Sequence, residues 1–320
     1  MNAKKLISIP ALLLCGAILT SCNVGNQKIT FIEYWKSDSL SSETVKEKLV
    51  YDVVVENLSK DAFVNYQNGV YTSELTSATQ NDTIVYTLKT SLTIEAVYTY
   101  GEESVTFQDS VSSETVFDRA LAPISSHKEI VCNTPTNPSL EISKLSDCYT
   151  YFKSVSDIAY EGNKAVTSLY LETKDDNGEI RSSTQTPSVE IDDKKYTYLD
   201  NEQLLLSLRG IDPASTSSGK VLAYSPFVSA VQTIKFNYGS QTGGEFSFTK
   251  NGTALSQETI QYYPVTLQID AKNSGNAQTV WIAKATSAGK NTYRNVMLRL
   301  QSPISYGIGT LVYTLKTAEF

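Results

Sequence analysis

Hydrophobic and polar residues alternate strictly along residues 84–100, the clearest pattern in the chain. The apolar side chains occupy even positions, broken only by Thr90, and the odd positions are mostly polar. This period of two predicts a β-strand with one buried face and one solvated face. At about 3.3 Å per residue the strand would span roughly 55 Å, so we expect it to twist and bend rather than lie in a flat sheet.

Two other segments alternate in the same way, residues 49–55 and 263–269. Asn-Gly pairs, the preferred residues of two-residue hairpin turns, separate strand-like runs at three places. They are Asn68-Gly69, Asn177-Gly178 and Asn251-Gly252. We therefore predict a hairpin at each pair and a largely antiparallel sheet.

Helical patterns are few. The best is 201–209, where Asp200 is a candidate N-cap, Gln203 occupies the capping-box position and Gly210 follows as a terminator. A second helix is predicted at 114–121, ending before Pro123, and a third at 146–153. The predicted fold class is β-dominated α+β: a large curved antiparallel sheet of long strands with a few short helices packed on one face.

The N-terminus has the pattern of a secretory signal peptide. Lys4 and Lys5 precede an apolar stretch, residues 6–19, which is shorter than the roughly 20 residues needed to span a membrane. The sequence Leu19-Thr20-Ser21-Cys22 that ends it resembles a bacterial lipobox. This resemblance implies cleavage before Cys22, a diacylglyceryl group on its thiol, and an extracytoplasmic protein anchored to the membrane, either at the cell surface or in the periplasm.

The expected organisation is a signal peptide (1–21), the lipidated cysteine and tether (22–40), and one large β-rich domain (41–320). The sequence of residues 85–90 recurs identically at 312–317. An internal duplication, or two subdomains divided near residue 240, remain alternatives, and so does convergence of two strands on the same residues.

The charge of the chain bears on its partners. Loss of Lys4 and Lys5 with the signal peptide changes the formal charge from −7 to −9. An acidic body without a basic cluster argues against nucleic acid as a partner and against electrostatic docking on anionic lipids. The lipid anchor is thus the expected membrane contact, and the sequence does not identify a protein partner.

Cys132 and Cys148 remain as a pair if Cys22 carries the lipid. They flank a proline-containing loop in a compartment that can be oxidising, which favours a disulfide between them. Two free, buried thiols are the alternative.

No catalytic constellation stands out. His127, the single histidine, follows Ser125 and Ser126, but adjacency in sequence does not supply the geometry of a dyad, and we expect a surface loop histidine. Three acidic pairs could serve a hydrolase: Glu102-Glu103, Asp175-Asp176 and Asp192-Asp193. The second loosely resembles a calcium loop but is better explained as a turn. We expect no metal, no cofactor and no catalytic role.

The leading functional hypothesis is binding of a hydrophobic or lipid-like ligand in the concave sheet. The architecture resembles that of lipid-handling envelope lipoproteins of the LolA and LppX type, without a specific motif of either. One alternative is a surface adhesion or assembly module that binds protein or glycan through aromatic residues, with candidates at 149–152 and 262–263. The second alternative is a hydrolase of envelope polymers.

Overall fold

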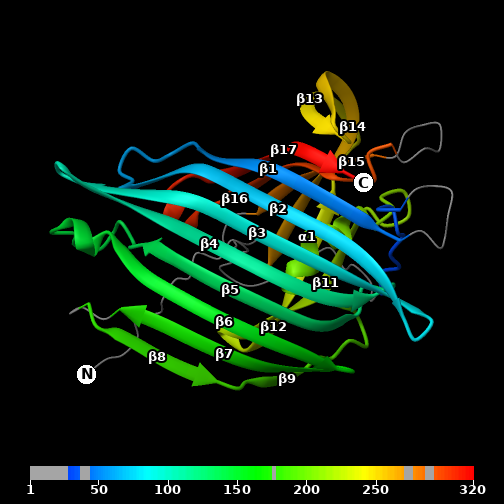
Figure 1. Ribbon diagram of the computed structural model, residues 1–320, viewed down its shortest axis with the longest axis horizontal. Coiled ribbons are helices and arrows are strands. Elements are labelled where there is room, and N and C mark those ends of the chain that lie inside the picture. Colours follow the sequence, from blue (N-terminus) through cyan, green and yellow to red (C-terminus); the bar gives the residue numbers. More distant parts are fainter. Residues whose placement is uncertain (1–27, 37–43, 175–177, 270–276, 285–291) are drawn as a thin grey trace.

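The computed structural model describes residues 28–36, 44–174, 178–269, 277–284 and 292–320. Hydrogen-bonded strands dominate it, and the predicted fold class is confirmed. The first group of strands, a broad curved layer (Figure 1), consists of β1 (Lys46–Glu56), β2 (Val64–Gln80), β3 (Thr83–Tyr100), β4 (Glu103–Asp118), β5 (Pro123–Pro135), β6 (Tyr149–Glu161), β7 (Lys164–Lys174), β8 (Ile180–Gln185) and β9 (Ser188–Glu190).

The second group continues the same sheet, mostly behind this layer, and β13 and part of β14 project above it at the top of the view (Figure 1). It consists of β10 (Thr197–Asp200), β11 (Ser218–Ser225), β12 (Ala230–Tyr238), β13 (Thr242–Lys250), β14 (Thr253–Ile269), β15 (Gln278–Ala283), β16 (Met297–Pro303) and β17 (Thr310–Glu319). β1 pairs with both β2 and β17, which joins the two groups. The pairing also continues across residue 240, because β14 pairs with β12 on one side and β15 on the other.

The sheet curls until its two ends approach one another, which makes it barrel-like. Ile158 of β6 and Ala165 of β7 pack against Leu222 and Tyr224 of β11 in one small hydrophobic cluster. The pairs β10–β11 and β13–β17 are parallel, and the other described pairs are antiparallel. The long alternating segment forms β3 as predicted, and its residues from Tyr86 to Tyr98 alternate between buried and less buried positions.

The predicted helix at 201–209 is confirmed as a 3₁₀ turn, η2 (Asn201–Gln203), followed by α1 (Leu204–Arg209). Asp200 accepts a hydrogen bond from the Glu202 backbone N–H, and the Gln203 side chain accepts one from the Asp200 N–H. Leu204, Leu206 and Leu208 are buried in the main core, so the helix lies inside the curled sheet. None of the described helices is long and apolar enough to cross a membrane.

The other two helix predictions were wrong. Residues 114–118 belong to β4, because this segment pairs with both β3 and β5 and its buried residues alternate. Residues 149–153 begin β6, and only a short 3₁₀ turn, η1 (Leu145–Asp147), precedes them. Two further 3₁₀ turns are η3 (Pro226–Val228) and η4 (Ser305–Gly307).

The three Asn-Gly pairs have different outcomes. Asn251 and Gly252 both have positive φ and connect β13 to β14, as predicted. Asn68 also has positive φ, but it lies in a bulge within β2, where the register with β3 shifts, so that hairpin prediction was wrong. Asn177 lies outside the described residues, although β7 and β8 do pair antiparallel on either side of it.

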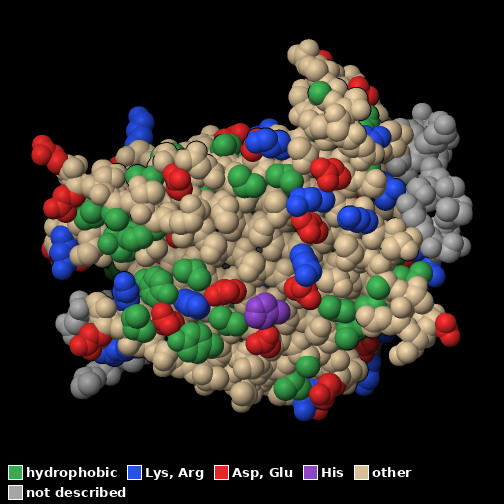
Figure 2. All heavy atoms as spheres, in the orientation of Figure 1, with side chains coloured by type: hydrophobic (Ala, Val, Ile, Leu, Met, Phe, Trp, Pro, Cys, Tyr) green, Lys and Arg blue, Asp and Glu red, His purple; other side chains and the backbone are tan. Residues whose placement is uncertain are grey.

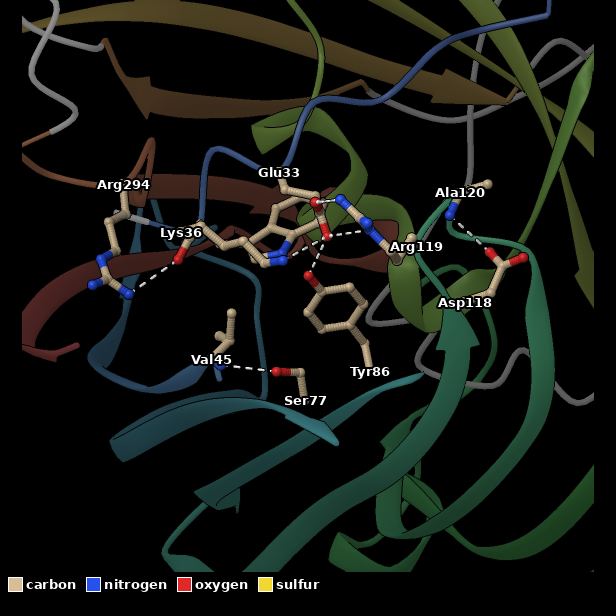
Figure 3. A network of polar contacts seen from close by, with 10 residues as sticks. Glu33, Lys36, Val45, Ser77, Tyr86, Asp118, Arg119, Ala120 and Arg294 are labelled. Carbon is tan, nitrogen blue, oxygen red and sulfur yellow. Dashed lines mark hydrogen bonds and ion pairs between the residues drawn. The ribbon is translucent and has the colours of Figure 1, made fainter. Parts of the chain in front are cut away.

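Residues 28–36 pack against the end of α1, where the Ile32 N–H donates a hydrogen bond to the Gly210 carbonyl oxygen. Glu33 accepts hydrogen bonds from Arg119 and Tyr86 and forms an ion pair with Lys36 at 3.2 Å (Figure 3). Burial raises the pKa of Glu33, but the hydrogen bonds from Arg119, Tyr86 and Lys36 outweigh it and leave the pKa below its ordinary value. Trp35, which lies between Glu33 and Lys36 in the sequence, is fully buried, so this segment contributes to the core of the domain.

Candidate functional site

An apolar cavity with a volume of about 60 Å³ lies inside the sheet, several residues along β3 from the cluster around Glu33. Strands β2 to β5 form one wall, and the end of β16, the start of β17 and the connection between them form the other. The lining residues are Tyr66, Leu92, Ile94, Asp109, Ser110, Val111, Cys132, Pro135, Ser302, Pro303, Ile304, Ser305, Tyr306 and Leu311.

Strand alternation and one bulge position the first wall. Leu92 and Ile94 are on the buried face of β3. The bulge at Asn68-Gly69 lies opposite Ile94, because the register between β2 and β3 shifts between Gln67 and Val70. A Cβ on Gly69 would lie 2.6 Å from the Val53 carbonyl oxygen and 3.0 Å from the Ile94 Cδ1. Only glycine therefore fits between β1 and this part of the cavity wall.

Asp109 is the one carboxyl among the residues that line the cavity. Its side chain is buried, with 7% of its surface exposed, and Oδ1 accepts a hydrogen bond of 2.9 Å from the Asn133 backbone N–H. Burial raises the pKa of Asp109 to about 7, against the opposing effect of the Asn133 hydrogen bonds. A carboxyl in this setting changes its charge near neutral pH.

The groups around Asp109 are weak acids. Tyr66, Tyr98 and Cys132 each have a pKa raised by burial, and the negative charge of Asp109 raises each further. The Tyr98 hydroxyl donates to the carbonyl oxygen of Asn133, so one residue binds both Asp109 and Tyr98. The Cys132 thiol is held neutral, which does not suit it as a nucleophile.

The structure contains Cys132 and Cys148 as free, buried thiols, so the predicted disulfide is not present in it. The register explains why. Cys132 pairs with Phe152, whereas the Cys148 carbonyl accepts from the N–H of Thr136, four residues further along. Four residues of strand separate the two levels by roughly 13 Å. A disulfide requires Cα atoms within about 7 Å.

The other predicted site residues do not assemble. His127 is on strand β5, not in a loop, and its exposed ring contacts the Asp157 carboxylate at 2.7 Å (Figure 2 shows it, purple, near the middle of one face). Glu102-Glu103 lie where a turn leads into β4, and Asp192-Asp193 lie in the connection between β9 and β10. Asp175-Asp176 and Cys22 lie outside the described residues. Within the described part of the chain, no three His, Cys, Asp or Glu residues are grouped as metal ligands would be.

The aromatic candidates are divided between the interior and partly exposed positions. Phe152 is buried, and the Tyr149 ring packs against the rings of Tyr98 and Phe107. Tyr262 and Tyr263 are half-buried, each beside another aromatic ring. The large apolar side chains that are exposed come from many different elements.

Asp109 was missed from the sequence, although a signal was present. Val105, Phe107, Asp109 and Val111 fall on one side of β4, so the acid interrupts an otherwise apolar series. Because successive side chains of a strand point to opposite faces, an acid in this series points to the same face as its apolar neighbours and is buried with them. The opposite wall, residues 302–306, is nearly two hundred residues away in the sequence, and no local pattern links it to Asp109.

No family model matches this chain, and no curated protein matches it. Among solved structures, the chain is similar to a β-barrel-like protein of the domain of unknown function DUF1849 from Brucella abortus. The TM-score is 0.49 and the sequence identity is 11%, over 86% of this chain and 97% of that chain.

Proposed function

We propose that this protein is a membrane-anchored, extracytoplasmic binding protein without a catalytic role, and that its cavity holds a small apolar ligand or the end of a larger one. The observation that carries the proposal is the apolar lining of an internal cavity in a barrel-like sheet, with Leu92, Ile94 and Val111 on one wall and Ile304 and Leu311 on the other. Covering the apolar surface of a ligand there is favourable by about 25 cal/mol per Å².

The cavity favours a short ligand. Its volume of about 60 Å³ exceeds the roughly 10–15 Å³ that are needed to hold one water molecule. Four-carbon compounds are therefore suitable probes, and a whole acyl chain would extend beyond the cavity.

Ligand binding is tested with n-butanol and the complete chain, followed by saturation-transfer NMR. We expect n-butanol to bind and Ile94→Trp to abolish its binding, because the indole fills the cavity. Ile180→Trp is the matched control, since Ile180 is 61% exposed on β8, far from the lining residues. Equal n-butanol binding by wild type and Ile94→Trp, with both folded by circular dichroism, would place the ligand elsewhere and refute the proposal.

The anchor is supported by the lipobox-like sequence and by the apolar segment before it. Two acyl chains, at about 0.8 kcal/mol per buried CH₂, hold a protein stably on a membrane, and one does not. We expect Cys22→Ser to move the protein from the membrane fraction of its host to the soluble extracytoplasmic fraction or to leave an uncleaved precursor. Mass spectrometry of the mature N-terminus checks this. A Cys22→Ser protein that is cleaved and remains membrane-bound would contradict it.

A further inference from the structure

The polar part of the ligand is determined by the one carboxyl that faces the cavity. We propose that the cavity binds a small organic amine in its protonated form, with the ammonium group on Asp109 and the alkyl part against the apolar wall. This inference rests on the proposed function, since it names the ligand class of the same cavity.

Charge complementarity favours a cation. None of the described residues that line the cavity is Lys, Arg or His. The titratable groups that influence or face Asp109 are Tyr66 of β2, Tyr98 of β3 and Cys132 of β5, which add no positive charge. The ionised carboxylate therefore has backbone and side-chain hydrogen bonds from Asn133, but no countercharge among these groups. A ligand ammonium would supply that countercharge and up to three hydrogen-bond donors.

Other head groups fit less well. A carboxylate or phosphate would place a second negative charge beside Asp109 in a poorly solvated site, where repulsion is strong. A neutral hydroxyl can donate one hydrogen bond to Asp109, but it leaves the buried charge unbalanced. Among head groups of one size, the expected order of affinity is therefore ammonium, hydroxyl, carboxylate.

The binding should depend on pH in a specific direction. With the pKa of Asp109 at about 7 in the empty cavity, the carboxyl is mostly protonated at pH 6 and mostly ionised at pH 8. An alkylamine, like a lysine side chain with a pKa of about 10.4, remains charged over this range. Because the ammonium binds the ionised carboxylate, its affinity should rise roughly tenfold from pH 6 to pH 8.

The experiment measures the complete chain with n-butylammonium, n-butanol and butyrate, at pH 6 and pH 8, by saturation-transfer NMR titration. We expect n-butylammonium to bind most tightly at pH 8 and to lose about tenfold in affinity at pH 6, with little change for n-butanol. Asp109→Asn should remove the preference for n-butylammonium and its pH dependence while n-butanol still binds. Asp82→Asn is the matched control, because Asp82 is an exposed acid in the turn between β2 and β3.

The outcomes separate the two proposals. If n-butanol binds to the wild type and Ile94→Trp abolishes this binding, the proposed cavity stands. If n-butylammonium then binds no more tightly than n-butanol at pH 8, the amine assignment is overturned. If Asp109→Asn keeps the full preference for n-butylammonium, the amine binds at another site and the assignment also fails. If none of the three compounds binds, the proposed function fails together with the amine assignment.

Discussion

Arg209→Met is expected to destabilise the fold by about 3–5 kcal/mol, because it leaves a buried carboxylate without its partner. The Arg209 guanidinium, at the end of α1, binds both oxygens of Glu47 on β1, at 2.6 and 2.8 Å. The two side chains are 4% and 1% exposed. Arg209 also donates to the carbonyl oxygen of Arg294, at 2.9 Å. The substitution therefore leaves Glu47 charged or forces it to take up a proton on folding.

A double substitution distinguishes the unpaired charge from loss of packing. Replacing a buried ion pair by apolar residues of similar volume is often neutral or stabilising. We expect Glu47→Leu combined with Arg209→Met to recover most of the stability lost in the single variant, as measured by urea unfolding. The comparable exposed pair, Lys316 with Asp52, provides the contrast: Lys316→Met should change the free energy of unfolding by less than about 1 kcal/mol. An Arg209→Met protein as stable as wild type would contradict the buried-charge argument.

The parts of the fold that could be predicted are those in which local pattern and tertiary pairing agree. Strand β3 pairs on both edges from Val85 to Tyr98, apart from the bulge opposite Ile94, and its alternation of apolar and polar residues is correspondingly strict. The helix at 201–209 has its N-cap, capping-box residue and terminator within eleven residues, so its signals are local and strong. Both predictions needed no knowledge of distant contacts.

The wrong helix and hairpin predictions rest on local sequence signals that occur in more than one kind of structure. A Ser followed by Glu114 resembles a helix start, but pairing with β3 and β5 makes the segment a strand. Asn68 does adopt the positive φ that it favours, but in a bulge and not in a reversal of the chain, and Gly69 beside it lets β1 approach Ile94 closely. Propensity indicated the backbone conformation correctly, and tertiary pairing decided its role.

The candidate site was beyond prediction because its two walls are far apart in sequence. The position of Asp109 on the apolar side of β4 could have been noticed, but its lack of a nearby cation could not, since this depends on which residues the curled sheet brings together. The cysteine prediction failed for a related reason. Spacing along the chain suggested a closed loop, whereas the strand register placed the two thiols at different levels.

Asp109→Asn is expected to stabilise the protein at pH 8 by about 2–4 kcal/mol and to have little effect at pH 4. The pKa of Asp109 is raised from its ordinary 3.8 to about 7 by burial. Between these values the folded state holds a proton that the unfolded state has released, so stability falls as the pH rises. Above pH 7 both states are ionised and the full penalty is present. An amide avoids the penalty and still accepts the hydrogen bond from the Asn133 N–H.

Urea unfolding of wild type, Asp109→Asn and the control Asp82→Asn at pH 4 and pH 8 measures this difference. Asp82→Asn should follow wild type at both pH values, because Asp82 is exposed. Equal stability of Asp109→Asn and wild type at pH 8 would mean that the carboxylate is solvated or paired, and that the cavity does not hold an unbalanced charge. If the variant is instead more stable and no longer prefers n-butylammonium to n-butanol, one substitution will have increased stability and removed the preference for the amine. That combination is expected of a group whose buried charge binds a ligand and lowers the stability of the fold.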